Sequence, residues 1–148
     1  MDLLTMVLAC SAFSDNSVAS AMAEINSKNN PLVISGKPFS SEKKALDYVE
    51  QLKAQGTSFE IGLMQIPNRL LDNSPIPVSM KELLRPCKNM IVATQLLNQF
   101  KFTPECNGST ACALSMYKSG DPQTGLDYAN QVIQYAQDHP VIPPPPLE

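Results

Sequence analysis

The apolar residues of this chain recur with the period of an α-helix, and no other feature limits its fold as strongly. Within residues 17–28 the apolar positions stand at i, i+3, i+4 and i+7, which places them on one helix face. They are Val18, Ala21, Met22 and Ile25. We expect this helix to end before Asn29-Asn30-Pro31, because a residue that precedes proline avoids the helical region. The pattern predicts a domain built mainly from amphipathic helices.

Capping residues divide the rest of the chain into further helices and short extended segments. Ser40 or Ser41 is expected to cap a helix that runs to about Gln55. Ser79 and Glu82 make a capping box for a single helical turn. Further helices are predicted near residues 3–10, 86–100, 109–118 and 123–138, and extended segments at 32–34 and 57–61. We therefore predict an α+β fold class, predominantly helical, with a small β element.

The length and charge of the chain exclude several classes of protein. With 148 residues, of which 43% are apolar, it has the size of one domain with a single core. Its 11 Lys and Arg residues are scattered and stand against 14 Asp and Glu residues, giving a net charge of -3. This distribution argues against binding nucleic acid. No apolar stretch approaches the roughly 20 residues that cross a bilayer, so we expect no membrane span.

The last nine residues differ from the body of the chain, because five of its 13 prolines lie there and four of them are consecutive. Such a run favours a solvated polyproline II segment that cannot join a packed core. We therefore predict one domain over residues 1–139 and a proline-rich tail or linker over 140–148. Acting as a ligand or tether for a partner is one role open to this tail.

The first apolar segment, residues 3–10, has two interpretations. Small and apolar residues precede Cys10, as they do at a lipoprotein cleavage site. A positively charged n-region is missing, however, and the apolar stretch is short. We favour a first amphipathic helix from which the signal peptide has been removed.

Four cysteines form an even set without a C-x-x-C pair, namely Cys10, Cys87, Cys106 and Cys112. Only one histidine, His139, is available to them, so we expect no zinc or other metal site. Two disulfides in an oxidising compartment fit this count, although buried free thiols in a cytosolic protein fit it as well. Of the three pairings we favour Cys10 with Cys87 and Cys106 with Cys112. The second is local, and the first ties an N-terminal helix to the middle of the chain.

Three segments follow one another in a distinctive order. They are the helix end Asn26-Ser27-x-x-Asn30-Pro31, the string Gly62-Leu63-Met64-Gln65-Ile66, and the segment from Pro86-Cys87-x-Asn89 to Tyr117-x-x-Gly120. Together they resemble the lysozyme-like lytic transglycosylases, and specifically the VirB-type branch that accompanies bacterial conjugation and type IV secretion machines. The resemblance covers about residues 8–136.

The resemblance implies a periplasmic, lysozyme-like protein that cleaves the peptidoglycan glycan strand between N-acetylmuramic acid and N-acetylglucosamine without a cofactor. In that family one glutamate at a helix end protonates the glycosidic oxygen and later deprotonates the attacking hydroxyl. The sugar's own 6-hydroxyl then closes a 1,6-anhydro ring, so no second carboxylate is required. The implied protein partners are subunits of a secretion or conjugation apparatus.

This chain departs from the family at the catalytic position. The family pattern reads Glu-Ser-x-x-Asn-Pro, whereas this chain has Asn26 in place of the glutamate. A carboxamide has no proton to give at neutral pH, and losing general acid-base help costs roughly 10²- to 10⁴-fold in rate. Pro67 and Lys118 also replace asparagines that the family commonly has. An engineered knock-out explains Asn26 alone, so we favour natural degeneration of the site.

Two glutamates are rival candidates for the missing acid. Glu24 lies two residues before Asn26, but on a helix it points about 200° away, beside the solvated face. Glu60 stands immediately before Ile61-Gly62, at a variable and often acidic family position near the cleft wall. The alternative for each is a solvated surface carboxylate.

Four retained family positions are expected to bind the glycan strand: Ser27, Met64, Gln65 and Tyr117. Met64 has the alternative role of core filler, and Tyr117 that of a helix residue bonded to a carbonyl.

Three hypotheses for the function follow. The first is a peptidoglycan-engaging accessory protein with weak or absent cleavage. The second is an active transglycosylase using Glu24 or Glu60, and the third is a scaffold without sugar affinity.

Overall fold

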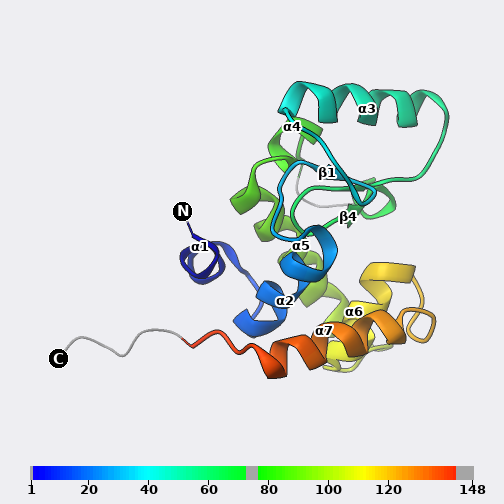
Figure 1. Cartoon of the computed structure of the whole chain (residues 1–148). Helices are drawn as coiled ribbons and strands as arrows, with labels where there is room; N and C mark the ends of the chain where they lie inside the picture. The colour runs from blue at the N-terminus through cyan, green and yellow to red at the C-terminus, as the bar shows by residue number, and fades with distance from the viewer. Residues whose placement is uncertain (1, 73–76, 143–148) are drawn as a thin grey trace.

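The computed structural model (Figure 1) describes residues 2–72 and 77–142, and this part of the chain is predominantly helical. Its α-helices are α1 (Leu3–Cys10), α2 (Asn16–Ser27), α3 (Glu42–Ala54), α4 (Met80–Leu83), α5 (Pro86–Lys101), α6 (Thr110–Ser119) and α7 (Leu126–Asp138). Its strands are β1 (Val33–Ile34), β2 (Lys37–Pro38), β3 (Glu60–Ile61) and β4 (Ile66–Pro67), and a 3-10 helix, η1 (Asn68–Leu70), follows β4. The predicted helical α+β class with a small β element is confirmed.

Helix α2 has well-defined signals at both ends. The Asp15 carboxylate accepts hydrogen bonds from two backbone N–H groups of the first turn, at 2.9 and 3.2 Å. The helix ends at Ser27 because Lys28 and Asn29 adopt left-handed backbone conformations, with φ angles of 55° and 62°. This end precedes Pro31, as the sequence predicts. It places the side chains of the last helical turn beside the strands.

Two other predicted caps are present. The Ser41 hydroxyl accepts a hydrogen bond from the third residue of α3, and Ser79 and Glu82 form the reciprocal capping box of α4. Helix α7 begins later than the expected residue 123. The Asp121 carboxylate accepts hydrogen bonds from the backbone N–H groups of Gln123 and Thr124, at 2.7 and 3.0 Å. Those bonds hold the backbone in a turn.

The four short strands pair antiparallel in the order β2-β1-β3-β4. Ile34 pairs with Ile61, which pairs with Ile66, and all three side chains are fully buried. Of the expected extended segment 57–61, only Glu60–Ile61 is a strand. The sheet presents the turn after β3 to the end of α2.

Helix α5 lies between two groups of elements in Figure 1 and packs against α1, α4 and α6. Helix α6 packs against α5, and α7 packs against both α2 and α6. On the other side, α3 packs against β1. The predicted apolar stripes of α2 and α5 supply much of the core: Val18, Ala21, Met22, Met90, Ala93, Leu96 and Leu97 are buried, and Ile25 and Phe100 are partly buried. No helix within the described ranges is both long and apolar enough to cross a membrane.

The disulfide pairing predicted from the sequence is confirmed. One disulfide joins Cys10, at the end of α1, to Cys87, in the first turn of α5, across a sequence separation of 77 residues. The other joins Cys106 to Cys112 across a separation of 6 residues. The long bridge therefore holds the N-terminal helix on the central helix.

Only the start of the predicted proline-rich tail belongs to the described residues. The Val141 backbone N–H donates to the Ser17 hydroxyl at 2.8 Å, so the chain still contacts α2 after α7. The consecutive prolines lie outside the described residues, and the division at residue 140 stays a prediction.

The two disulfides should differ in what they contribute to stability. In the chain-entropy model, replacing Cys10 and Cys87 together by alanine lowers the free energy of unfolding by about 4 kcal/mol, and replacing Cys106 and Cys112 lowers it by about 2 kcal/mol. Urea denaturation of the two double variants and the unmodified protein measures both changes. Equal losses would contradict the assignment of the long bridge as the main cross-link.

Candidate functional site

The end of α2 lies beside a cavity of about 410 Å³ whose walls come from α2, the β1–β2 connection, β3, α6 and α7. The lining residues used below are Asn26, Glu60, Gln65, Lys118 and Tyr128. Position 26, where the sequence comparison expects a glutamate, therefore faces a cavity.

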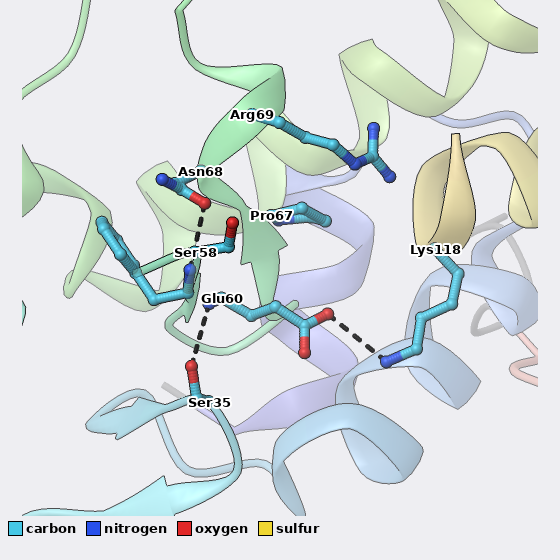
Figure 2. Close-up of a pocket in the computed structure, with 8 residues that line it drawn as sticks. Ser35, Ser58, Glu60, Pro67, Asn68, Arg69 and Lys118 are labelled. Atoms are coloured by element: carbon cyan, nitrogen blue, oxygen red, sulfur yellow. Dashed lines mark hydrogen bonds and ion pairs between the residues drawn. The ribbon is translucent and has the colours of Figure 1, made fainter. Parts of the chain in front are cut away.

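Two further cavities adjoin the first. One of about 380 Å³, shown in Figure 2, shares Glu60 and Lys118 with it. Another, of about 460 Å³, shares Asn26 with it. These neighbouring cavities share lining residues and together extend from Arg69 past Asn26 to Pro38, and we call them the groove.

Asn26 is held at the groove by the backbone of the turn after β3. Its side-chain Nδ2 donates a hydrogen bond to the Met64 carbonyl at 2.9 Å. The Tyr117 hydroxyl donates to the same carbonyl at 2.7 Å. One residue further along α2, the Ser27 hydroxyl donates to the Leu63 carbonyl at 2.7 Å. Together these bonds join α2, the turn and α6.

The turn itself is held by Asn89 of α5, which is fully buried. Its Oδ1 accepts from the Met64 N–H at 2.8 Å, and its Nδ2 donates to the carbonyls of Ile61 and Leu83 at 3.0 and 2.9 Å. Gly62 has a φ angle of 83°, and a Cβ there would lie only 2.2 Å from Asn89 Nδ2. The glycine of the predicted motif is therefore required both by conformation and by space.

The Gln65 side chain forms hydrogen bonds with the surrounding backbone. Its Oε1 accepts from the Gly36 N–H at 2.9 Å, and its Nε2 donates to the carbonyls of Val33 and Gly62 at 2.9 and 2.8 Å. Its φ angle of 47° is unusual for a residue with a side chain, so these bonds also stabilise a strained backbone. Gln65 lines the groove but is 4% exposed.

All four predicted glycan-binding side chains are buried, and Met64 and Tyr117 line none of the three cavities, whereas Ser27 and Gln65 each line one. Met64 and Tyr117 are 0% and 1% exposed, and Ser27 is 7% exposed. The structural alternatives, a core methionine and a tyrosine bonded to a carbonyl, describe Met64 and Tyr117 as they lie here. Burial also raises the pKa of Tyr117 well above its usual value, so its phenol keeps its proton. Their contact with a sugar remains a prediction.

Tyr128 is a residue that the sequence analysis did not single out. It lies in the first turns of α7, and its hydroxyl is buried without a hydrogen-bond partner among the residues that the structure describes. The Asn26 carboxamide lies close enough to influence this hydroxyl but makes no hydrogen bond with it. Burial, with the nearby charge of Glu60, raises the pKa of Tyr128. In the sequence, Tyr128 is only an aromatic residue in an expected helix, and nothing there indicates that it lies at the groove.

The two rival glutamates lie in different places. Glu60 lines the groove, and its Oε2 pairs with Lys118 Nζ at 3.3 Å (Figure 2). Glu24 lines none of the three cavities, and its carboxylate accepts a hydrogen bond from the Asn29 side chain. The structure therefore brings Glu60, and not Glu24, to the same cavity as Asn26.

The two other substituted positions also line the groove. Pro67, in β4, pairs with Glu60 across the sheet and offers no N–H to a ligand. Lys118 places an ammonium where the resemblance expects an amide.

Among the described residues, no three His, Cys, Asp or Glu side chains are grouped to hold a metal ion. The groove therefore offers hydrogen bonds and a few charges.

Amides, a tyrosine and several charged side chains line the groove, and such a surface suits a polar ligand. The family model described as the transglycosylase SLT domain matches residues 8–137. The chain belongs to this family. An SLT domain has the lysozyme-like fold, which confirms the fold predicted from the sequence, and its function is lytic-transglycosylase-like and related to peptidoglycan. No curated protein and no solved structure matches the chain.

The SLT assignment and the two disulfides are together consistent with a location outside the cytoplasm, where peptidoglycan lies and disulfides persist.

Asn89 of this SLT domain should be essential for the turn that bears Met64. Replacing Asn89 by alanine removes three buried hydrogen bonds to the backbone, so we expect the free energy of unfolding to fall by about 3 kcal/mol. Urea denaturation measures the loss. The control is Asn130→Ala on the exposed side of α7, for which we expect a change within about 0.5 kcal/mol. Similar losses in both variants would show that Asn89 does not hold the turn.

Proposed function

We propose that this SLT domain engages peptidoglycan in the periplasm as an accessory protein of a bacterial conjugation or type IV secretion apparatus, and that it cleaves the glycan strand weakly or not at all. One observation carries the proposal. At the groove position where a proton donor is expected, the Asn26 carboxamide donates to the Met64 carbonyl. General acid catalysis needs a group that releases its proton to the leaving oxygen, and a carboxamide does not.

The neighbours of Asn26 do not replace the missing acid. Tyr128 lines the same cavity as Asn26, but its raised pKa means that it holds its proton at neutral pH. Tyr117 is buried and already donates to Met64. Glu24 lies off the groove, bonded to Asn29.

The remainder of the groove supports binding without cleavage. Its cavities persist although the acid is missing, and its walls carry hydrogen-bonding groups from α2, the sheet and α7. Ser27, Met64, Gln65 and Tyr117 fix the shape of its floor, which is how we expect them to contribute to recognition of the glycan strand.

The secretion partner is inferred from the motif combination. The resemblance to the VirB-type branch rests on the order of the helix-end, Gly-Leu-Met-Gln-Ile and Tyr-x-x-Gly segments, and the Asn26, Pro67 and Lys118 substitutions support a member that has lost its chemistry. The proline-rich tail at 140–148 is a candidate tether to the neighbouring subunits.

An active enzyme that uses Glu60 is the second candidate, and one observation favours it. Glu60 lines the same cavity as Asn26, with its carboxylate within reach of a bound ligand. Its Oε2 is bonded to Lys118, however, and a general acid must carry a proton of its own. A third candidate, a scaffold without sugar affinity, differs from both in failing to sediment with purified peptidoglycan.

Restoring the acid should restore cleavage. In Asn26→Glu the carboxyl group lies near the Met64 carbonyl, which repels a carboxylate and favours the protonated form. We expect clearing of a peptidoglycan suspension to be about 10²- to 10⁴-fold faster than with the unmodified protein. Asn26→Gln is the matched control, because it has the same length as glutamate without an acid, and it should give no gain.

The rival mechanism predicts a different pattern in the same turbidity assay. If Glu60 is the acid, the unmodified protein clears the suspension at an ordinary enzymatic rate and Glu60→Gln abolishes this activity. We expect neither result. Sedimentation of the unmodified protein with peptidoglycan, measured in parallel, separates an inert binder from a scaffold that has no affinity for the sugar.

A further inference from the structure

The ion pair between Glu60 and Lys118 crosses the groove. Glu60 belongs to β3 on one wall, and Lys118 belongs to α6 on the other (Figure 2). Both side chains line the cavity of about 410 Å³ that holds Asn26 and also the cavity of about 380 Å³ beside Arg69. The pair is therefore the boundary between these two parts of the groove.

Lys118 is held in this position by two contacts. Its Nζ lies 3.3 Å from Glu60 Oε2 and 5.4 Å from the centre of the Tyr128 ring, so an anion and an aromatic face share the ammonium. The two charged side chains are 43% and 30% exposed, which keeps the pair accessible to solvent and weak enough to open.

From this geometry we infer that Glu60 and Lys118 form a latch that must open before a glycan strand can occupy the groove continuously from Asn26 to Arg69. This inference rests on the proposed binding of peptidoglycan. A strand that passes from one cavity to the other must displace the bond between the two side chains. The latch thus lowers the affinity for a neutral glycan and makes that affinity sensitive to salt, since ions screen an exposed pair.

Binding of a neutral N-acetylglucosamine tetramer, measured by isothermal titration calorimetry, tests the latch. The tetramer carries no charge, so salt acts on the protein alone. Removing either partner, with Glu60→Gln or Lys118→Asn, should raise the affinity about two- to fivefold, which is the range expected from an exposed ion pair. The double variant should gain no more than either single variant, because both remove the same bond.

Salt and two further variants complete the experiment. Raising NaCl from about 0.05 to about 0.5 M should increase the affinity of the unmodified protein and leave both single variants nearly unaffected. Exchanging the charges, with Glu60→Lys and Lys118→Glu together, should lower the affinity again. The control is Lys43→Asn, which removes an exposed ion pair of 3.0 Å on α3, away from the groove residues, and should not alter binding.

The possible failures are distinct. Tighter binding by the single variants, lost again on charge exchange, supports the latch. If the unmodified protein binds the tetramer and the single variants bind equally or more weakly, the latch is wrong while the proposed binding stands, because the two side chains then contact the sugar or do nothing. If no variant binds either the tetramer or peptidoglycan, the proposed function itself is wrong, and the latch with it.

Discussion

The Met64 backbone carbonyl organises the candidate site, because it joins segments that are far apart in the sequence. It accepts hydrogen bonds from Asn26 of α2 and Tyr117 of α6, at 2.9 and 2.7 Å. A carbonyl oxygen has two lone pairs, so these donors occupy both of them. The side chain at position 26 therefore faces a hydrogen-bond acceptor and must itself be a donor. The N–H of an amide satisfies that structural requirement as well as a protonated acid does, but it cannot release its proton.

Structure and catalysis are therefore separable at this position. With a carboxamide at position 26 the helix end, the turn and the groove are in place, since Asn89, Gln65 and Ser27 hold the turn independently of residue 26. What changes is the chemistry that the groove can perform. The Tyr128 hydroxyl is buried near this carboxamide and has no hydrogen-bond partner among the described residues. Under the proposed function, the groove keeps a binding role without the reaction.

The sequence predicted the features that depend on local residue patterns or on the spacing of the cysteines. The end of α2 before Pro31, the capping box at Ser79 and both disulfides follow from backbone sterics, side-chain length and chain topology, and the structure contains them. The sequence could not predict which side chains reach the groove surface. Met64 and Tyr117 lie under this surface, whereas Tyr128 and Lys118, which pairs with Glu60, line it. Tertiary packing between α2, α6 and α7 determines these positions. The motif predicted where the candidate site lies, and the packing of distant elements determines which side chains reach its surface.

Mass spectrometry of glycan strands after prolonged incubation with the unmodified protein distinguishes an inert groove from an active one. If position 26 lacks the required acid, strands with new 1,6-anhydro-N-acetylmuramic acid ends should not accumulate above the level found in buffer, even at equimolar protein. Accumulation of such ends in excess of the protein present would demonstrate turnover, and would contradict the view that the carboxamide at position 26 has removed the chemistry.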